Sequence, residues 1–106
     1  NSAAKKAMLY IQENYSKDIS LDDVSGLVNI SPYYFSKIFK EETGENFIEY
    51  LTKIRIEKAK EFLVKPDISI KEAGIRSGYT DPNYFSRIFK KQTDMTPSEY
   101  KTRYGE

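Results

Sequence analysis

The sequence predicts an all-α protein of about seven helices, arranged as two similar halves. Three observations support this fold class. First, residues 31–40 return as residues 81–90 with seven identities, and an eighth position exchanges Lys37 for Arg87. Second, apolar residues recur every three or four positions, and no segment alternates as a strand would. Third, the breaks in this periodicity fall at capping and turn residues. A repeat of this length indicates two copies of one supersecondary unit.

Apolar spacing and a serine cap predict the first two helices. Residues 3–15 form an amphipathic stretch whose apolar side is Ala4, Met8, Ile11 and Tyr15. Ser20 precedes a second, short helix over residues 21–28, and its hydroxyl suits the N-cap position. The inward residues of this short helix are Leu21, Val24 and Val28.

A third helix is predicted after the turn at residues 29–31. Ser31 is a favourable N-cap, and Pro32 suits the first helical position because no N–H is needed there. The helix is expected to run to Thr43. It should end at Gly44, since glycine adopts the left-handed conformation readily.

A long helix is predicted next, from Asn46 or Phe47 to Leu63, and Pro66 prevents its continuation. Asn46 and Glu49 have the spacing of a capping box at its start. Its roughly 17 residues span about 25 Å at ~1.5 Å per residue. A helix of this length could hold the two halves of the chain apart.

The second half repeats the order of the first. Ser69 and Glu72 are expected to cap a short helix over residues 70–77, and after a turn Asp81-Pro82 opens the copy of the third helix. A last short helix begins at residues 96–99, Thr-Pro-Ser-Glu, which combine a cap, an early proline and a capping-box glutamate. We therefore predict a first subdomain over residues 1–45, a linker helix over 46–65 and a second subdomain over 66–106.

Composition excludes several classes of site. The 106 residues include no Cys and no His, so disulfides, thiolate metal sites and a histidine base are absent, and no metal site or other cofactor is expected. An enzyme is therefore the least favoured class. No apolar run approaches the ~18–20 residues of a membrane span, so we expect no membrane association and a cytoplasmic location. Because the chain begins at Asn1, we expect it to be a piece of a longer protein.

Each copy of the repeated helix has two distinct sides. On a helical wheel, the apolar residues of each copy share one side, which we expect to face the core. They are Phe35, Ile38 and Phe39 in the first copy, and Phe85, Ile88 and Phe89 in the second. The opposite sides carry polar and cationic residues at positions i, i+3, i+4 and i+7. We call them the first reading face (Tyr33, Ser36, Lys37, Lys40) and the second reading face (Asn83, Ser86, Arg87, Lys90). Although the net charge is only +1, residues 32–40 and 82–91 contain basic residues and no acid.

These faces predict binding to double-stranded DNA. A short helix, a tight turn and a second helix form a helix-turn-helix, whose second helix enters the major groove. Arginine bonds guanine, asparagine bonds adenine, and lysine suits phosphate. We predict base contacts from Tyr33, Ser36, Lys37, Asn83, Ser86 and Arg87. We predict backbone contacts from Ser31, Tyr34, Lys40, Tyr84, Lys90 and Lys91. For Tyr34 and Tyr84 we favour packing at the edge of the core, with the hydroxyl reaching a phosphate.

The faces have two other interpretations. One basic helical face alone is usually just a solvated surface, but two acid-free copies behind similar turns favour nucleic acid. The main alternative is a helical module that binds another protein, such as RNA polymerase or an acidic partner. That alternative predicts no dependence on DNA sequence and little effect of changes at Asn83 or Arg87.

The chain resembles the DNA-binding domain of the AraC/XylS family of bacterial transcription regulators over essentially its whole length. The signature lies in residues 77–90, SGYTDPNYFSRIFK, and in residues 96–100, TPSEY, while residues 54–59 resemble the linker helix of that family. The resemblance implies two helix-turn-helix subdomains and transcription regulation. It also implies a further N-terminal sensor or phosphorylated receiver domain, and we expect RNA polymerase as a second partner.

Four positions depart from the pattern. Asn29 stands where the second copy has Gly78, but asparagine tolerates a positive φ, so the turn should survive. Asp94 replaces a glycine like Gly44, so the sequence predicts a less sharp helix end there. Ser77 stands at an inward position, and Gly74 lies within a helix at a cost of about 1 kcal/mol relative to alanine. The second half is therefore expected to be the less stable one.

Overall fold

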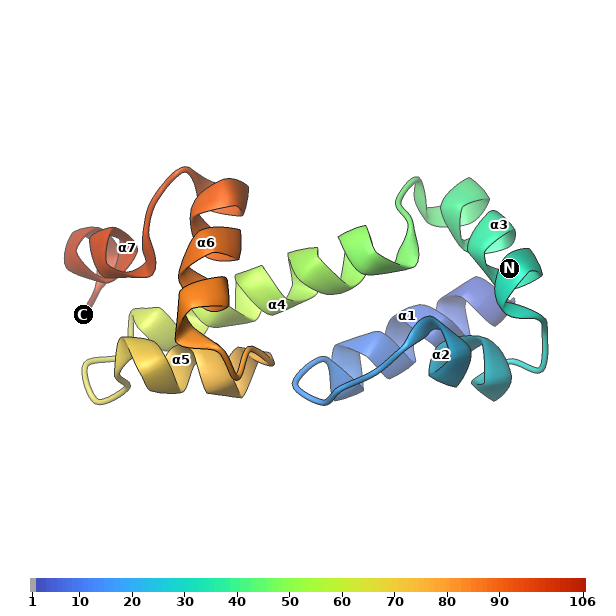
Figure 1. Cartoon of the computed structure of the whole chain (residues 1–106), viewed down its shortest axis with the longest axis horizontal. Helices are drawn as coiled ribbons and strands as arrows, with labels where there is room; N and C mark the ends of the chain where they lie inside the picture. Colours follow the sequence, from blue (N-terminus) through green and yellow to red (C-terminus); the bar gives the residue numbers. More distant parts are fainter. Residues whose placement is uncertain (1) are drawn as a thin grey trace. The chain divides into compact units, whose positions relative to one another are not determined.

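The computed structural model describes residues 2–106 and confirms an all-α fold with seven helices over that range (Figure 1). The helices are α1 Ser2–Asn14, α2 Leu21–Leu27, α3 Pro32–Thr43, α4 Phe47–Leu63, α5 Ile70–Ser77, α6 Pro82–Thr93 and α7 Pro97–Tyr104. The chain divides within α4 into two compact units, Asn1–Thr52 and Lys53–Glu106, here called unit 1 and unit 2.

The helices begin at the predicted caps. The Ser31 hydroxyl accepts a hydrogen bond from the Tyr34 N–H at 3.2 Å. Asn46 and Glu49 exchange the two bonds of a capping box, both 2.8 Å long. Such a cap typically contributes about 1 kcal/mol. Ser69 also accepts from the N–H of Glu72, whereas the Glu72 carboxylate accepts from Arg76 at 3.2 Å. Local sequence therefore determines where these helices start.

Left-handed residues end the helices of both copies. Gly44 has a φ of 82°, and its N–H donates to the carbonyl of Lys40 at 2.9 Å. The expectation of a less sharp end at Asp94 is wrong. Asp94 has a φ of 65° and donates to Lys90 at 2.8 Å, so the two helices end alike. A short polar side chain tolerates this conformation. Asn29 has a φ of 59°, which confirms the prediction for that turn.

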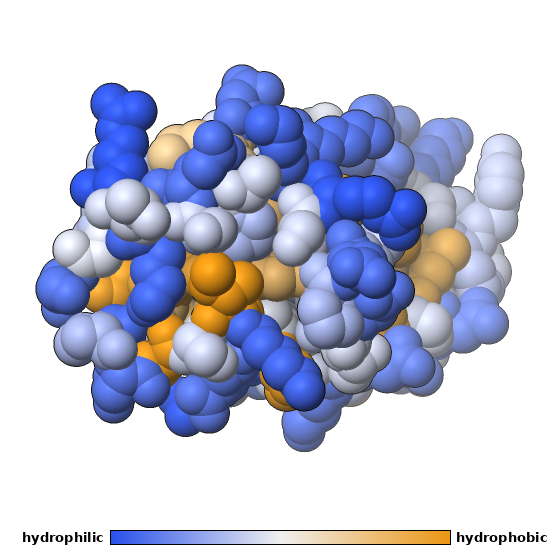
Figure 2. Space-filling view, turned by 60° about the vertical axis from the view of Figure 1, so that its left-hand side comes forward, coloured by the Kyte–Doolittle hydropathy of each residue, from blue (hydrophilic) through white to orange (hydrophobic). Residues whose placement is uncertain are grey.

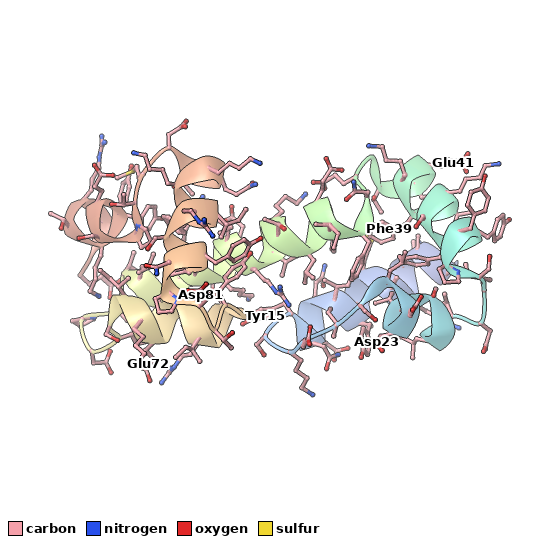
Figure 3. The ribbon with its side chains drawn as sticks, in the orientation of Figure 1. Tyr15, Asp23, Phe39, Glu41, Glu72 and Asp81 are labelled. Carbon is pink, nitrogen blue, oxygen red and sulfur yellow. The ribbon has the colours of Figure 1, made fainter. Side chains whose placement is uncertain are left out.

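The core of unit 1 forms around two phenylalanines of α3. Phe35 and Phe39 are both fully buried, with ring centroids 5.3 Å apart. Phe39 points into the unit, whereas Glu41 points away from it (Figure 3). Tyr50 of α4 meets Phe39 edge-on at 5.5 Å, and its hydroxyl accepts a hydrogen bond from Gln12 of α1 at 2.9 Å. The beginning of α4 is therefore part of this core.

Unit 2 has the corresponding core around α6. Phe85 and Phe89 are buried with Leu63 of α4 and Ala73 of α5. Gly74 lies directly beneath Phe85, because a Cβ at this position would be only 2.8 Å from the Phe85 Cδ2 atom. The close approach of α5 to α6 thus requires the glycine that its helix propensity disfavours.

Ser77 is compatible with its place in the core of unit 2. Its side chain is fully buried, and its hydroxyl donates to the carbonyl of Gly74 at 3.0 Å. A buried hydroxyl with a partner costs far less than an unpaired one. This departure from an apolar residue therefore has a local compensation.

A lysine of α7 forms hydrogen bonds with the segment that connects α4 to α5. The Nζ atom of Lys101 donates to the carbonyl oxygens of Leu63, Lys65 and Ile68 at 2.9, 2.8 and 2.9 Å. Three donors of one ammonium group thus meet three acceptors, two of them at the end of α4 or just after it. A cation at a helix C-terminus is also favoured by the helix dipole.

Replacing Lys101 with methionine is expected to lower the free energy of unfolding of unit 2 by about 1–3 kcal/mol. The apolar stem is kept, but three carbonyls lose a charged donor. Thermal or urea unfolding followed by circular dichroism measures the loss. The control is Arg103→Met, an exposed cation on the same helix, which should change stability by no more than about 0.5 kcal/mol. Equal effects of the two substitutions would contradict a structural role for Lys101.

Hydrophilic residues cover most of the face shown in Figure 2, and hydrophobic ones emerge between them in small areas. Within residues 2–106, no helix combines the length and apolar character needed to cross a membrane.

Candidate nucleic-acid interface

Each unit contains a short helix, a tight turn and a second helix in contact: α2 with α3, and α5 with α6 (Figure 1). The two turns have the same backbone bonds. The Ile30 N–H donates to Ser25 at 3.2 Å, and the equivalent Tyr79 N–H donates to Gly74 at 2.8 Å. These bonds span five residues, as in a Schellman motif at a helix C-terminus. The geometry that directs each second helix is therefore repeated.

The first reading face lies at the surface of α3. Tyr33 is 82% exposed, Lys37 and Lys40 are exposed, and Ser36 is half-buried. The four residues share one side of the helix, opposite the buried Phe35. Tyr34, one of the predicted backbone contacts, is 53% exposed beside this face.

The second reading face lies at the surface of α6. Asn83, Arg87 and Lys90 are exposed, and Ser86 is half-buried. The neighbouring Lys91 is exposed as well. The structure thus brings together, within unit 2, each residue that the sequence predicted for this face.

The predicted core residues have the expected burial. Ile38 and Ile88 are half-buried, and the four phenylalanines of the two stripes are buried. Tyr84 lies at the edge of the core, as predicted, because its ring packs 5.8 Å from that of the buried Tyr79. Its own exposure is 46%, so the ring also borders the solvent.

The N-terminal ends of the two reading helices differ in charge. Ser31 caps α3 with a neutral hydroxyl, whose own proton can still be donated. Asp81 is the N-cap of α6 (Figure 3), and its carboxylate accepts from the Asn83 N–H at 3.0 Å. A carboxylate at this position repels a nearby phosphate. The predicted phosphate contact at the helix start therefore suits α3 better than α6.

A carboxylate accompanies the last lysine of each reading face, a relation that sequence reasoning missed. Lys40 lies 3.8 Å from Glu49, and both side chains are more than half exposed. In unit 2 the backbone N–H and the hydroxyl of Thr96, and then the charge of Lys90, hold the pKa of Glu99 below its usual range. The signal was available, since both glutamates follow their lysine by nine residues, 40 to 49 and 90 to 99.

The arrangement offers donors and cations, and little else that could perform chemistry. Among residues 2–106 there is no group of three or more His, Cys, Asp or Glu residues placed to hold a metal ion. Each face presents hydroxyl or amide groups near the start of its helix and cations further along. Such a surface can donate hydrogen bonds to base edges and neutralise phosphates.

Comparison with known proteins agrees with this geometry. A family model described as a helix-turn-helix domain matches residues 24–103. The regulatory protein PocR of Salmonella typhimurium is 36% identical over 106 residues, which cover all of this chain and 35% of PocR. The chain therefore spans about a third of the length of this relative.

Solved structures match over nearly the whole chain. The C-terminal domain of AraT, a response regulator from Geobacillus stearothermophilus, has a TM-score of 0.96 and 38% identity, covering 100% of this chain and 88% of that domain. The DNA-binding domain of AdpA, a global transcriptional factor solved in complex with a target DNA, has a TM-score of 0.90 and 21% identity. It covers 95% of this chain and 91% of AdpA's chain. At this identity the AdpA match is evidence for the fold.

Proposed function

This chain belongs to the AraC/XylS family of helix-turn-helix transcription regulators, and we propose that it binds specific double-stranded DNA sites through α3 and α6. One observation carries the proposal: the two helices present exposed faces of the same design, with no acid among the residues of either face, each behind the same backbone turn. The second helix of a helix-turn-helix is the one that enters the major groove.

Roles are assigned by chemistry and position. Base edges would be read by Tyr33, Ser36 and Lys37 in one site half and by Asn83, Ser86 and Arg87 in the other. Arg87 suits guanine O6 and N7, and Asn83 suits adenine. The backbone would be held by Ser31, Tyr34, Lys40, Tyr84, Lys90 and Lys91. These contacts fix the register of the protein without reading sequence.

The proposal extends to the layout of the DNA site. The two reading helices belong to one chain, and the 17 residues of α4 correspond to about 25 Å of helix. We propose that they read two adjacent major-groove segments, about 34 Å apart on one side of B-DNA. Because the two faces differ in sequence, the site would be asymmetric or resemble a direct repeat.

The whole protein is proposed to work as a regulator of transcription with a separate input domain. The chain covers only a third of PocR, which leaves room in such a protein for a sensor or a receiver domain. The AraT domain, which is similar to this chain, comes from a response regulator. We further propose RNA polymerase as a protein partner and the cytoplasm as the location, because transcription takes place there in bacteria.

Selection of bound duplexes from a random pool tests the DNA proposal. The chain should enrich a site with two conserved segments spaced by about one helical turn. Equal affinity for all duplexes, or no binding at low salt, would overturn the proposal. If the chain binds all duplexes with equal affinity and also binds RNA polymerase, the alternative of a protein-binding module is favoured.

Lys40→Ala and Lys90→Ala should each weaken binding to every duplex and lower the slope of log K against log salt by about one. Each lysine is exposed, and removing a phosphate contact reduces the number of released counterions. Titrations at several salt concentrations give the slope. The control is Lys5→Ala, an exposed lysine of α1 that lies outside both reading faces, which should leave the slope unchanged. A slope unaffected by Lys40→Ala and Lys90→Ala would count against their phosphate role.

A further inference from the structure

Four side chains of unit 2 form a continuous row of contacts that ends at the second reading face. The Arg55 guanidinium of α4 lies 5.5 Å from the centroid of the Tyr79 ring. The rings of Tyr79 and Tyr84 are 5.8 Å apart, and the Arg87 guanidinium lies 5.8 Å from the centroid of Tyr84. The row thus runs from one cation over two rings tilted by 55° to a second cation.

The buried end of this row gives its exposed end a fixed support. Tyr79 is only 7% exposed, and its ring also stacks on that of Phe85 at 5.7 Å. Tyr84 rests against Tyr79 and is therefore held on one side by the core. Arg87 would otherwise be a long, exposed side chain with many rotamers, whose ordering on binding is costly.

The contact with Tyr84 does not occupy the groups of Arg87 that read a base. A cation–π contact uses the charge of the guanidinium and occupies none of its five N–H donors. These donors remain available for the O6 and N7 atoms of guanine. A ring beneath Arg87 therefore orients the guanidinium without competing with the DNA.

We propose that Tyr84 is a positioning residue that sets the preference of Arg87 for guanine. The inference rests on the proposed function, in which Arg87 reads a base. It assigns the ring of Tyr84 a role separate from the backbone contact predicted for its hydroxyl. Loss of the ring should reduce discrimination, whereas loss of the hydroxyl alone should not.

The first reading helix lacks two parts of this device. Lys37 takes the place of Arg87, and an ammonium group cannot make the planar, bidentate contact of a guanidinium. Ile30 takes the place of Tyr79, so no ring supports Tyr34 from that position. We therefore expect a guanine preference that depends on Tyr84 only in the half of the DNA site that α6 reads.

The experiment compares Tyr84→Leu with Tyr84→Phe in the full chain. The base pair contacted by Arg87 is first located as the one where Arg87→Ala relaxes discrimination. Affinities are then measured for duplexes that carry guanine, 7-deazaguanine or adenine at that position. Tyr84→Leu should reduce the preference for guanine about two- to fivefold, as expected for an exposed cation–π contact of about 0.5–1 kcal/mol. Tyr84→Phe should keep it. In an Arg87→Ala background, Tyr84→Leu should change the preference no further.

Several results would overturn the inference. They are an unchanged preference in Tyr84→Leu, an equal loss in Tyr84→Phe, or the same loss in the Arg87→Ala background. A uniform loss over all three duplexes with a smaller salt slope would instead show a phosphate contact only. Thermal unfolding confirms that each variant is folded, and Tyr84→Met replaces the leucine variant if that one unfolds. Failure of the proposed function is recognised separately, because the unsubstituted chain would then show no base preference at all.

Discussion

Arg87→Ala is expected to weaken binding to the preferred DNA site by about 1–3 kcal/mol and to relax discrimination at one base pair. The side chain is exposed on the second reading face, and its guanidinium lies 5.8 Å from the centroid of the Tyr84 ring. Its donors are thus available to a guanine. Truncation would leave the O6 and N7 atoms of that base without a protein donor.

Competition titrations with the selected site and with single-base variants measure both effects of Arg87→Ala. The control is Arg103→Ala on α7, an exposed arginine of the same unit that lies outside the reading face. It should change affinity little and discrimination not at all. If Arg87→Ala weakens specific and random DNA equally, Arg87 holds the backbone, and the base-reading role is wrong.

Gly74→Ala is expected to lower the free energy of unfolding of unit 2 by about 1–3 kcal/mol, although alanine is the better helix former. The new Cβ would be 2.8 Å from the Phe85 Cδ2 atom. Phe85 is 1% exposed and packs against Phe89 and Tyr79, so its ring has no free space to move into. Either α5 must separate from α6 or the ring must leave its rotamer, and both distort the packing.

The chain offers a matched control of opposite sign for this substitution. Gly26 lies in α2, and a Cβ there would meet nothing within 4 Å. Gly26→Ala should therefore stabilise the protein by about 0.5–1 kcal/mol through helix propensity alone. Chemical denaturation measures both changes. A stabilising Gly74→Ala would mean that α5 and α6 are further apart than the 2.8 Å distance to Phe85 indicates.

Gly74→Ala also separates stability from recognition. The substitution touches none of the predicted contact residues, but it lies beneath the helix that carries them. We expect DNA affinity to fall only in conditions where unit 2 is partly unfolded, and the base preference of the folded fraction to persist. Titrations at two temperatures distinguish this from direct damage to the reading face.

Local chemistry explains why so much of the fold could be predicted from sequence. The helices that start at Ser31 and Asn46 are capped by hydrogen bonds between residues only three positions apart. The buried side of each helix follows from apolar residues spaced three or four positions apart. At Asp94 a prediction from residue type alone was wrong. Its N–H donates to the carbonyl of Lys90 just as the N–H of Gly44 donates to that of Lys40, so the aspartate ends its helix in the same way as the glycine. Six of the eight reading-face residues are exposed as predicted, whereas Ser36 and Ser86 are half-buried. The contacts of these faces with DNA remain predictions.

Long-range contacts account for what the sequence could not reveal. The bonds of Lys101 reach carbonyls 33 to 38 residues away, and no periodicity signals them. The same holds for the contact between Arg55 and Tyr79, which joins α4 to a turn. The need for Gly74 became clear only when the distance between two helices was known. Such features depend on how elements meet, and a residue pattern describes each element separately.

Because α4 contributes Tyr50 and Leu51 to the core of unit 1 and Ile56 and Leu63 to that of unit 2, the protein has no dispensable spacer at which to cut it. A break at Thr52 would leave unit 1 with a helical stub of less than two turns, too short to persist unaided. Gene fusions that borrow one half should therefore carry all of α4, and protease nicking in this helix should release fragments that lose their fold rather than two working modules.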